Sequence, residues 1–441
     1  MRIAYFSPLR PKASGVSDYS SELIPELIAL GLQIDVFIDN GYEVDPAVHE
    51  LPCAIHPVSD YERQADSLRY DVNLYHMGNN VQYHDYIYRQ SLEHPGVVVF
   101  HDYALHHLLA ERTIAIADRN AYRREIEAQY GPRLAALIPY TLTGVLPPLW
   151  EAYSMEFPAN KLLLATMQGA VVHSQFVASR LRADGYRGPV EVVPMLGRAS
   201  ESSGTDALQA REMLGIDAAE LVFGSFGFLS AAKRPLAILD AFARIRSSLP
   251  PFRVFFVGSQ VDAVDYAAEV QKRGLQDVVV FTGSVTSGGF AAYLAACDVC
   301  LNLRYPTQGE TSATLIRALA QGKPIITSEI GSFSEYPGDF VRRLPVNGNE
   351  VEALCEALLD MASDRRRLVK MGRSAREYAF SKHSGARAGR LYTDFLVAVA
   401  KISEQARLWR PHVSRLARSH DPGRLDEEID RLAKSLARSF P

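Results

Sequence analysis

The sequence predicts an α/β protein built from two successive units, each a parallel sheet with helices on both faces. Short apolar runs alternate with helical patterns along the chain, which is typical of βα units. The runs lack the polar alternation of half-exposed strands, so we expect strands that are buried on both faces. The 441 residues also exceed the roughly 250–300 residues that a single core usually supports.

The first unit contains the predicted strands IAYFSP, QIDVFID, DVNLYHM, GVVVFHD, GAVVHS and VEVVPM. A helix over about residues 19–30 follows the first of them. The stretch 104–160 is helix-rich and longer than an ordinary connection, so we expect a helical insertion there. Its apolar segment LAALIPYTLTGVLPPLW either packs as a helix pair or forms a surface that touches lipid or acceptor. We favour packing, because prolines often end helices that tuck against a sheet.

The second unit repeats the pattern after a Gly/Ser-rich stretch that reads as a linker. Its predicted strands are LVFGSFGFL, FRVFFVG, VVVFTG, VCLNLRY and PIITSEIG. Both units are therefore predicted to be Rossmann-like, doubly wound domains. The predicted boundaries are 1–197 for the first domain, 198–206 for the linker, 207–385 for the second domain, 386–409 for a helix that returns toward the first, and 410–441 for an amphipathic helical tail.

Composition excludes several classes of protein. The formal charge of -4 argues against a general nucleic-acid binder, and 47% hydrophobic residues argue against a disordered chain. Four cysteines make no disulfide framework in a chain of this length. The N-terminus does not resemble a signal peptide, and no apolar stretch is long enough to span a bilayer as a helix. We expect a cytoplasmic protein, with the tail packing on the body or, as an alternative, touching the inner face of a membrane.

The clearest local signal lies in residues 304–328, where a strand runs into a Pro/Gly loop and then a helix. Gly309 lies in the loop, and Glu310, Thr311 and Ser312 are predicted to form the first helical turn. The free N–H groups of such a turn bind phosphate oxygens, and a carboxylate beside them can accept bonds from sugar hydroxyls. A capped helix without a ligand explains the same residues.

Two further loops follow predicted strands at the edge where an open α/β sheet binds its ligand. Gly227 and Phe228 end one strand, and Lys233 follows at a helix start, where it either neutralises a diphosphate or is simply solvated. Ser14 and Gly15 lie in the opening loop, and Gly15 lets backbone approach a substrate. Neither loop contains G-x-G-x-x-G or a P-loop motif, so a nicotinamide, flavin or P-loop nucleotide site is not predicted.

Histidines close two neighbouring predicted strands. His76 ends one strand and is followed by Asn79 and Asn80, while His101 ends the next strand beside Asp102. A single histidine at such a place is usually structural. Two of them at the ligand-facing edge favour a functional role.

No Asp-x-Asp occurs in the chain, although paired carboxylates commonly hold a divalent ion against a diphosphate. We therefore expect no metal and no other cofactor. Lys233 and the amino end of a helix would carry the compensating positive charge instead.

The chain resembles glycosyltransferase family 4, whose members have the GT-B architecture of two facing Rossmann-like domains. The resemblance rests on the order of SGVSDYS, VVVFHD, VVHSQFVASRL, VEVVPM, KRP, VFTGSV and PTQGETS followed by LIRALAQGKPII, and it covers most of residues 1–400. It implies retaining transfer of a sugar from a nucleotide-diphosphate donor, bound by the C-terminal domain, to a glycan or lipid-linked acceptor bound by the N-terminal domain.

The resemblance also implies roles for residues. Lys233 would contact the diphosphate and Glu310 the donor hydroxyls, while His101 would lie beside the transferred sugar; these three are the predicted catalytic residues. The predicted donor-binding residues are Gly15, Gly227, Phe228, Lys233, Gly283, Ser284, Val285, Gly309, Glu310, Thr311 and Ser312, with the turn at 283–285 facing the base. The predicted acceptor-side residues are Ser14, Gly15, His76, Asn79, Asn80 and His101.

Two positions depart from the family pattern. Phe228 stands where the family often has an arginine ahead of the lysine, and Arg317 stands where it often has a second glutamate. These departures leave open a protein that binds a nucleotide sugar without catalysis. A nucleotide-sugar epimerase of the same fold is a further alternative to a transferase.

Overall fold

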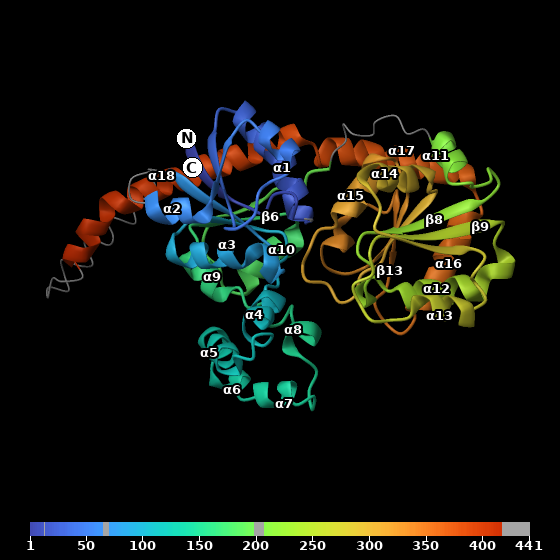
Figure 1. Ribbon diagram of the computed structural model, residues 1–441, viewed down its shortest axis with the longest axis horizontal. Coiled ribbons are helices and arrows are strands. Elements are labelled where there is room, and N and C mark those ends of the chain that lie inside the picture. Colours follow the sequence, from blue (N-terminus) through green and yellow to red (C-terminus); the bar gives the residue numbers. More distant parts are fainter. Residues whose placement is uncertain (13, 65–69, 198–206, 417–441) are drawn as a thin grey trace.

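The computed structural model contains two parallel sheets, one in each half of the chain (Figure 1). It describes residues 1–12, 14–64, 70–197 and 207–416. Within these residues the N-terminal sheet has seven strands in the order β3-β2-β1-β4-β5-β6-β7, and the C-terminal sheet has six in the order β10-β9-β8-β11-β12-β13. The two-domain α/β prediction is therefore confirmed. The predicted linker 198–206 and the tail from residue 417 onward lie outside the described residues.

The strands of the N-terminal sheet are β1 (Arg2–Phe6), β2 (Gln33–Ile38), β3 (Ala54–Pro57), β4 (Val72–Met77), β5 (Val97–Phe100), β6 (Gly169–Val172) and β7 (Val190–Val192). Those of the C-terminal sheet are β8 (Leu221–Phe226), β9 (Phe252–Val257), β10 (Val279–Gly283), β11 (Val299–Asn302), β12 (Ile325–Ser328) and β13 (Val341–Leu344). Every residue of β5, β6 and β8 is buried, as the unbroken apolar runs predict.

The helices of the first half are α1 (Gly15–Ala29), α2 (Val58–Gln64), α3 (Val81–Glu93), α4 (His106–Thr113), α5 (Arg119–Tyr130), α6 (Pro132–Ala135), α7 (Ile138–Leu142), α8 (Leu149–Ala152), α9 (Lys161–Thr166) and α10 (Gln175–Ala183). Those of the second half are α11 (Ala207–Met213), α12 (Pro235–Ile245), α13 (Tyr266–Lys272), α14 (Ser287–Ala296), α15 (Ala313–Ala320), α16 (Glu350–Ala362), α17 (Arg365–Lys382) and α18 (Gly385–Leu416). Short 3-10 turns are η1 (Pro46–Glu50), η2 (Ala231–Lys233), η3 (Arg246–Ser248) and η4 (Gly331–Glu335).

The sequence patterns missed the two edge strands β3 and β13. The segments AIHP and VRRL carry polar residues and are partly exposed, because an edge strand has a neighbour on one side only. The first helix also starts four residues before the predicted residue 19, because the Ser14 hydroxyl accepts a hydrogen bond from the Val16 N–H and caps the helix at Gly15.

Helix α18 follows the C-terminal domain in sequence but packs on the N-terminal domain (Figure 1). It lies along α1, where the hydroxyls of Tyr19 and Tyr392 are 2.9 Å apart. Gly169 in β6 has no room for a side chain, because a Cβ there would lie 2.9 Å from Phe395. The fully buried Leu396 belongs to the same cluster. The helix thereby joins the two domains through a shared hydrophobic core.

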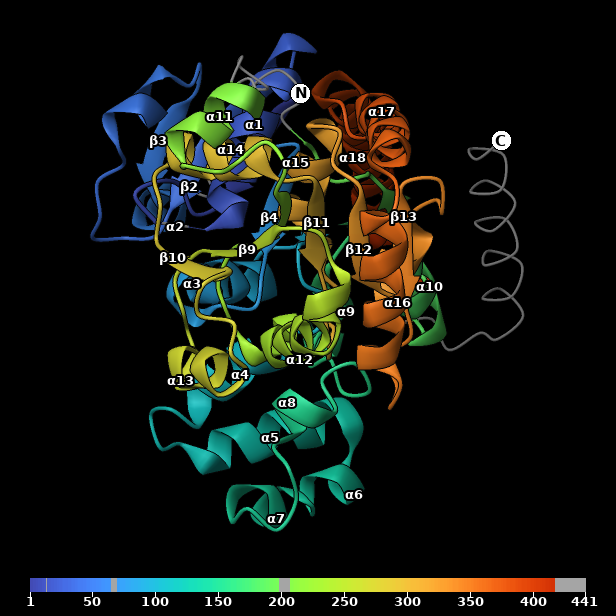
Figure 2. The ribbon, with the colours of Figure 1, turned by 90° about the vertical axis from the view of Figure 1, so that its right-hand side faces the viewer.

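Helices α5–α8 gather at one end of the molecule, away from both sheets (Figures 1 and 2). They have a small core of their own that includes Tyr122, Ile126 and Ile138. The segment LAALIPYTLTGVLPPLW is only partly packed: Ile138 is buried, whereas Tyr140 and Val145 are 53% and 70% exposed. No helix in the described ranges is both long and apolar enough to cross a membrane.

Truncation of the buried Leu396 in α18 should destabilise the protein. Leu396→Ala removes a fully buried side chain from the shared core and is expected to lower the free energy of unfolding by about 2–5 kcal/mol. Denaturant unfolding followed by circular dichroism measures this loss. The exposed Lys401→Ala serves as the control on the same helix, and equal effects of the two substitutions would contradict the packing of α18 described above.

Candidate active site

The loop after β8 brings Lys233 next to the amino end of α15. Gly227 has a φ of +85°, and a Cβ built on it would lie 2.7 Å from the Lys233 Nζ and 3.6 Å from a methyl carbon of Thr314. Both side chains therefore border the same space at Gly227. A larger residue would collide with the Lys233 ammonium group and would also be strained at this φ. The structure thus brings Lys233 and the start of α15 together, as the sequence predicted for this lysine and the helix.

The environment of Lys233 weakens its hold on its proton. Its Nζ donates a hydrogen bond to the carbonyl oxygen of Phe226. Burial lowers the pKa of Lys233 to about 7, and the positive charge of Arg304 contributes to the lowering. A bound anion would stabilise the charged form of Lys233 and raise its pKa again.

The helix α15 begins at Ala313, so the prediction of a first turn formed by residues 310–312 is wrong. The Ser312 hydroxyl caps the helix by accepting a hydrogen bond from the Leu315 N–H, and it donates to the Asn302 side chain at 2.9 Å. Glu310 and Thr311 belong to the preceding loop. The first N–H groups of an α-helix have no carbonyl partner within it, and Thr314 in the first turn of α15 borders the space beside Gly227 and Lys233.

Glu310 organises its own loop. One carboxylate oxygen accepts hydrogen bonds from the Thr307 hydroxyl at 2.8 Å and from the Gln308 N–H at 2.7 Å. The other oxygen lies 2.9 Å from the Arg304 Nε. The predicted contact of Glu310 with donor hydroxyls stays a prediction, and Glu310 would make it while holding this loop together.

The same loop is fastened to the N-terminal domain. The carbonyl oxygen of Gln308 accepts hydrogen bonds from the N–H groups of Tyr103 and Ala104, both at 3.0 Å. Gly309 has a φ of +76°, and a Cβ there would lie 2.6 Å from Tyr103. Only glycine fits so close an approach. The second domain thus presents its loop 304–312 directly to the end of β5 in the first.

Two other contacts cross between the domains. The carboxylate of Glu335 in η4 accepts hydrogen bonds from the N–H groups of Gln175 and Phe176 at the start of α10. Arg317 in α15 lies 3.2 Å from the Asp18 carboxylate in α1. Arg317, which departs from the family pattern, is therefore in an ion pair that sequence reasoning did not foresee.

The predicted histidines of the N-terminal domain are in contact with each other. The His76 Nδ1 and the His101 Nε2 are 3.0 Å apart. His76 is fully buried and stacks on Tyr5. Burial holds the pKa of both imidazoles well below its usual range, which keeps both rings neutral.

Asp102 is a site residue that sequence reasoning named but did not assign. Its carboxylate accepts a hydrogen bond from the Asn79 N–H at 3.0 Å. Burial raises the pKa of Asp102 to about 7, and the negative charge of Glu310 adds to the rise. The end of β5 in one domain therefore faces the Glu310 loop of the other. The His-Asp pair at a strand end was the available signal.

Several predicted acceptor-side residues already have structural partners. The Asn79 side chain accepts a hydrogen bond from the Leu108 N–H, and the Asn80 side chain caps α3. Ser14 caps α1. Gly15 is exposed, and a Cβ on it would meet nothing within 4 Å, so there is open space in front of it.

The remaining predicted donor-side residues lie along the same edge of the C-terminal sheet. The turn Gly283, Ser284 and Val285 follows β10, which is separated from β8 by β9. Gly258, directly after β9, lies between the turn at Gly283 and the loop at Gly227. It pairs with Gly283, and a Cβ on it would lie 2.5 Å from the Gly227 carbonyl oxygen. Phe228 is 58% exposed.

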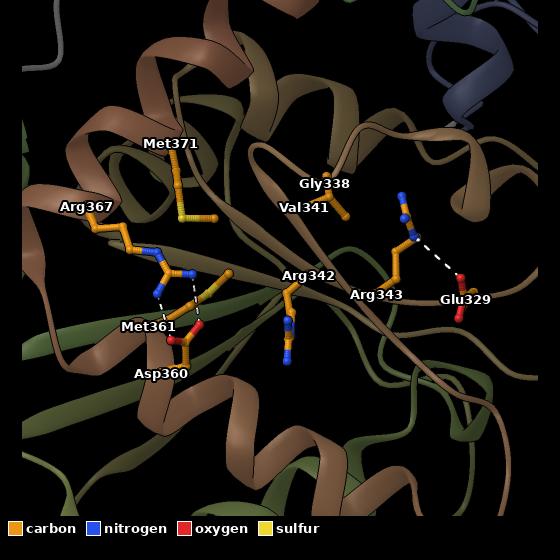
Figure 3. A pocket seen from close by; sticks show the side chains of 9 residues that line it. All are labelled: Glu329, Gly338, Val341, Arg342, Arg343, Asp360, Met361, Arg367 and Met371. Atoms are coloured by element: carbon orange, nitrogen blue, oxygen red, sulfur yellow. Dashed lines mark hydrogen bonds and ion pairs between the residues drawn. The ribbon is translucent and has the colours of Figure 1, made fainter.

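A separate cavity of about 240 Å³ lies in the C-terminal domain beside β13, α16 and α17 (Figure 3). In it Arg367 pairs with Asp360 at 2.6 Å, and Arg343 lies 3.6 Å from Glu329. No residue of the predicted site lines it.

Within the ranges that the structure describes, no group of three or more histidine, cysteine, aspartate or glutamate residues is arranged to hold a metal ion.

Residues 206–378 match the family model described as glycosyl transferases group 1. That range spans most of the C-terminal domain, including Lys233 and the 304–312 loop. The chain is also 24% identical over 194 residues to the lipopolysaccharide core biosynthesis mannosyltransferase LpsB of Rhizobium meliloti, covering 41% of this chain and 54% of the relative. It is 26% identical over 204 residues to a D-inositol 3-phosphate glycosyltransferase of Nocardia farcinica, covering 44% of each chain. The chain thus matches about half the length of these curated relatives.

Solved structures resemble the whole chain. Anabaena HepE, crystallised in complex with UDP and glucose, superposes with a TM-score of 0.61 at 17% identity and covers 90% of this chain and 100% of its own. The sucrose-phosphate synthase of Thermosynechococcus elongatus gives a TM-score of 0.59 at 18% identity and covers 92% and 99%. The fold is therefore GT-B, as predicted.

Anion binding at Lys233 should depend on pH. Because the pKa of Lys233 is about 7, its ammonium group is charged below this pH and loses its proton above it. Pyrophosphate gains negative charge over the same range, so the ratio of wild-type affinity to Lys233→Gln affinity is the useful quantity. Calorimetry between pH 6 and pH 9 should show this ratio falling by up to about tenfold per pH unit above 7. A ratio that stays constant, or that rises with pH, would contradict the proposed environment of Lys233.

Proposed function

We propose that this protein is a retaining glycosyltransferase of family 4 that moves a sugar from a nucleotide-diphosphate donor to an acceptor hydroxyl. One observation carries the proposal: the Lys233 ammonium and the amino end of α15 border the same space at Gly227. A lysine with a lowered pKa and the amino end of a helix suit a diphosphate, which carries several negative charges. The group 1 family match over residues 206–378 supports the assignment to glycosyl transfer.

The partners follow from the same comparison. Names of the relatives refer to lipopolysaccharide core biosynthesis and to an inositol phosphate, and HepE was crystallised with UDP and glucose. We infer a nucleotide sugar as donor and a glycan or lipid-linked saccharide as acceptor, with the protein in the cytoplasm or at the inner face of the membrane. The relatives differ in substrate, so they support the class of reaction and leave the sugar open.

Charge stabilisation is the main contribution that we propose for the C-terminal domain. As the bond between the sugar and the phosphate breaks, negative charge grows on the leaving diphosphate. Lys233 and the N–H groups of α15 stabilise that charge, and they do so more strongly in the transition state than in the ground state. The anomeric carbon becomes oxocarbenium-like at the same time.

In the retaining mode the acceptor hydroxyl approaches the anomeric carbon from the same side from which the leaving group departs. The new bond joins the acceptor oxygen to the anomeric carbon, and the hydroxyl proton passes to an oxygen of the leaving diphosphate. No protein base is then required. The neutral His101, supported by His76 at 3.0 Å, is suited to hydrogen-bond the transferred sugar. Because burial lowers the pKa of His101, we do not expect this residue to act as a positively charged group in the reaction.

Replacement of Lys233 should slow the reaction strongly. Lys233→Ala removes a positive charge that the transition state needs, and we expect the barrier to rise by about 2–4 kcal/mol, a loss of roughly 30- to 1000-fold in turnover. The assay measures release of nucleoside diphosphate from a panel of nucleotide sugars with and without saccharide acceptors. The exposed Lys272→Ala is the control.

The products of that assay also separate the proposed transferase from its alternatives. A nucleotide sugar that is converted to an isomer without any acceptor would indicate an epimerase. Tight nucleotide binding with no turnover on any acceptor would indicate a binding protein. Full turnover by a folded Lys233→Ala variant would remove this lysine from the mechanism.

Chelation should leave the reaction intact. We propose that Lys233 and α15 take the place of a divalent ion, so EDTA is expected to leave the rate of transfer unchanged. The comparison uses enzyme dialysed against EDTA and the same sample with added magnesium. Loss of activity on dialysis that magnesium restores would show that the reaction depends on a metal.

A further inference from the structure

Arg304 is a second cation beside Lys233, and it comes from a different loop. The Arg304 N–H donates a hydrogen bond to the Ser328 hydroxyl at 2.9 Å. The next residue, Tyr305, donates from its N–H to the carbonyl oxygen of Ala232 at 2.8 Å, one residue before Lys233. The first bond ties the loop after β11 to the end of β12, and the second holds it against the loop after β8. The side chain of Arg304 is only 17% exposed.

The guanidinium group of Arg304 is incompletely paired. Its Nε lies 2.9 Å from a Glu310 oxygen, but the alignment is too poor for a hydrogen bond, and that buried N–H has no other partner. The second Glu310 oxygen is already engaged by Thr307 and Gln308. A buried donor without a well-aligned acceptor is costly, and so is a buried cation beside another cation. An anion placed between Arg304 and Lys233 would relieve both costs.

We propose that Arg304 binds the same diphosphate as Lys233 and supplies the second positive charge that Phe228 does not. This inference rests on the proposed function, because it names a further donor-binding residue of that site. The planar guanidinium group can contact two phosphate oxygens at once, whereas the lysine acts as a point charge. The second cation thus comes from the β11 loop instead of from position 228.

The position of Phe228 fits this exchange. It is 58% exposed and lies in the loop directly after Gly227, where the resembling family often has arginine. An arginine at 228 would bring a third cation close to Lys233, whose pKa the charge of Arg304 already lowers. With phenylalanine at position 228, no further repulsion between like charges arises, and Arg304 supplies the second positive charge.

The test measures binding of pyrophosphate, UDP, GDP and ADP to the full-length protein by calorimetry. Arg304→Gln is expected to weaken pyrophosphate binding roughly 10- to 100-fold, because a charged hydrogen-bonding group is removed. Arg273→Gln is the matched control, since Arg273 is 15% exposed and pairs with carboxylates at a distance from the site. Its binding of pyrophosphate should equal that of the wild type.

A second readout separates ligand binding from mere support of the loop. Since Arg304 contributes to the low pKa of Lys233, Arg304→Gln should move the basic limb of the pH profile of pyrophosphate binding to higher pH. Phe228→Arg added to Arg304→Gln should recover a large part of the lost affinity. If Arg304→Gln does not fold, Arg304→Lys is used instead. It keeps the positive charge but loses the planar guanidinium group, so it should bind pyrophosphate more weakly than the wild type but not lose binding.

The outcomes distinguish this inference from the proposed function. Wild-type protein that binds none of the four probes would refute the diphosphate site as a whole. Wild-type binding that Arg304→Gln leaves within twofold, with an unchanged pH profile, would overturn the role of Arg304 and leave Lys233 in place.

Discussion

The positive charge of Lys233 beside the amino end of α15 is the constraint around which the site is built. Burial and a second cation nearby disfavour the charged form of Lys233, and an anion beside it stabilises that form. The strands β8 and β11 are neighbours in the sheet, so the loops that follow them emerge side by side. One loop contributes Gly227 and Lys233, and the other contributes Arg304, Glu310 and the helix. The parallel sheet thereby concentrates positive potential at one edge.

The N-terminal domain completes this arrangement from the opposite side. The backbone of Gln308 is held by amides at the end of β5, and Gly309 has to be a glycine because Tyr103 lies against it. The Glu310 loop is therefore shaped partly by the other domain. Helix α18 reinforces the arrangement, since it leaves the C-terminal domain and shares its core with α1 and β6.

Burial decides the charge states that the site can use. His76 and His101 are neutral because burial disfavours the second proton that would charge either ring. Burial raises the pKa of Asp102 to about 7, and the negative charge of Glu310 from the other domain adds to the rise. The proposed site thus combines cations from the C-terminal domain with neutral imidazoles from the N-terminal domain, which is compatible with the proposed loss of a diphosphate without a protein base.

The sequence by itself determined the two parallel sheets, most of their strands, and the meeting of Lys233 with the 304–312 region. Unbroken apolar runs identify strands buried on both faces, and the ends of parallel strands must share an edge. Tertiary structure alone decided the start of α15, because Thr311 and Ser312 are both residue types that cap helices, and the hydrogen bond from the Ser312 hydroxyl to Asn302 favours Ser312. It also decided the places of Arg304, Asp102 and the Arg317–Asp18 pair, since contacts between residues far apart in the chain depend on how the loops and the two domains pack. Local pattern carries no information about that packing.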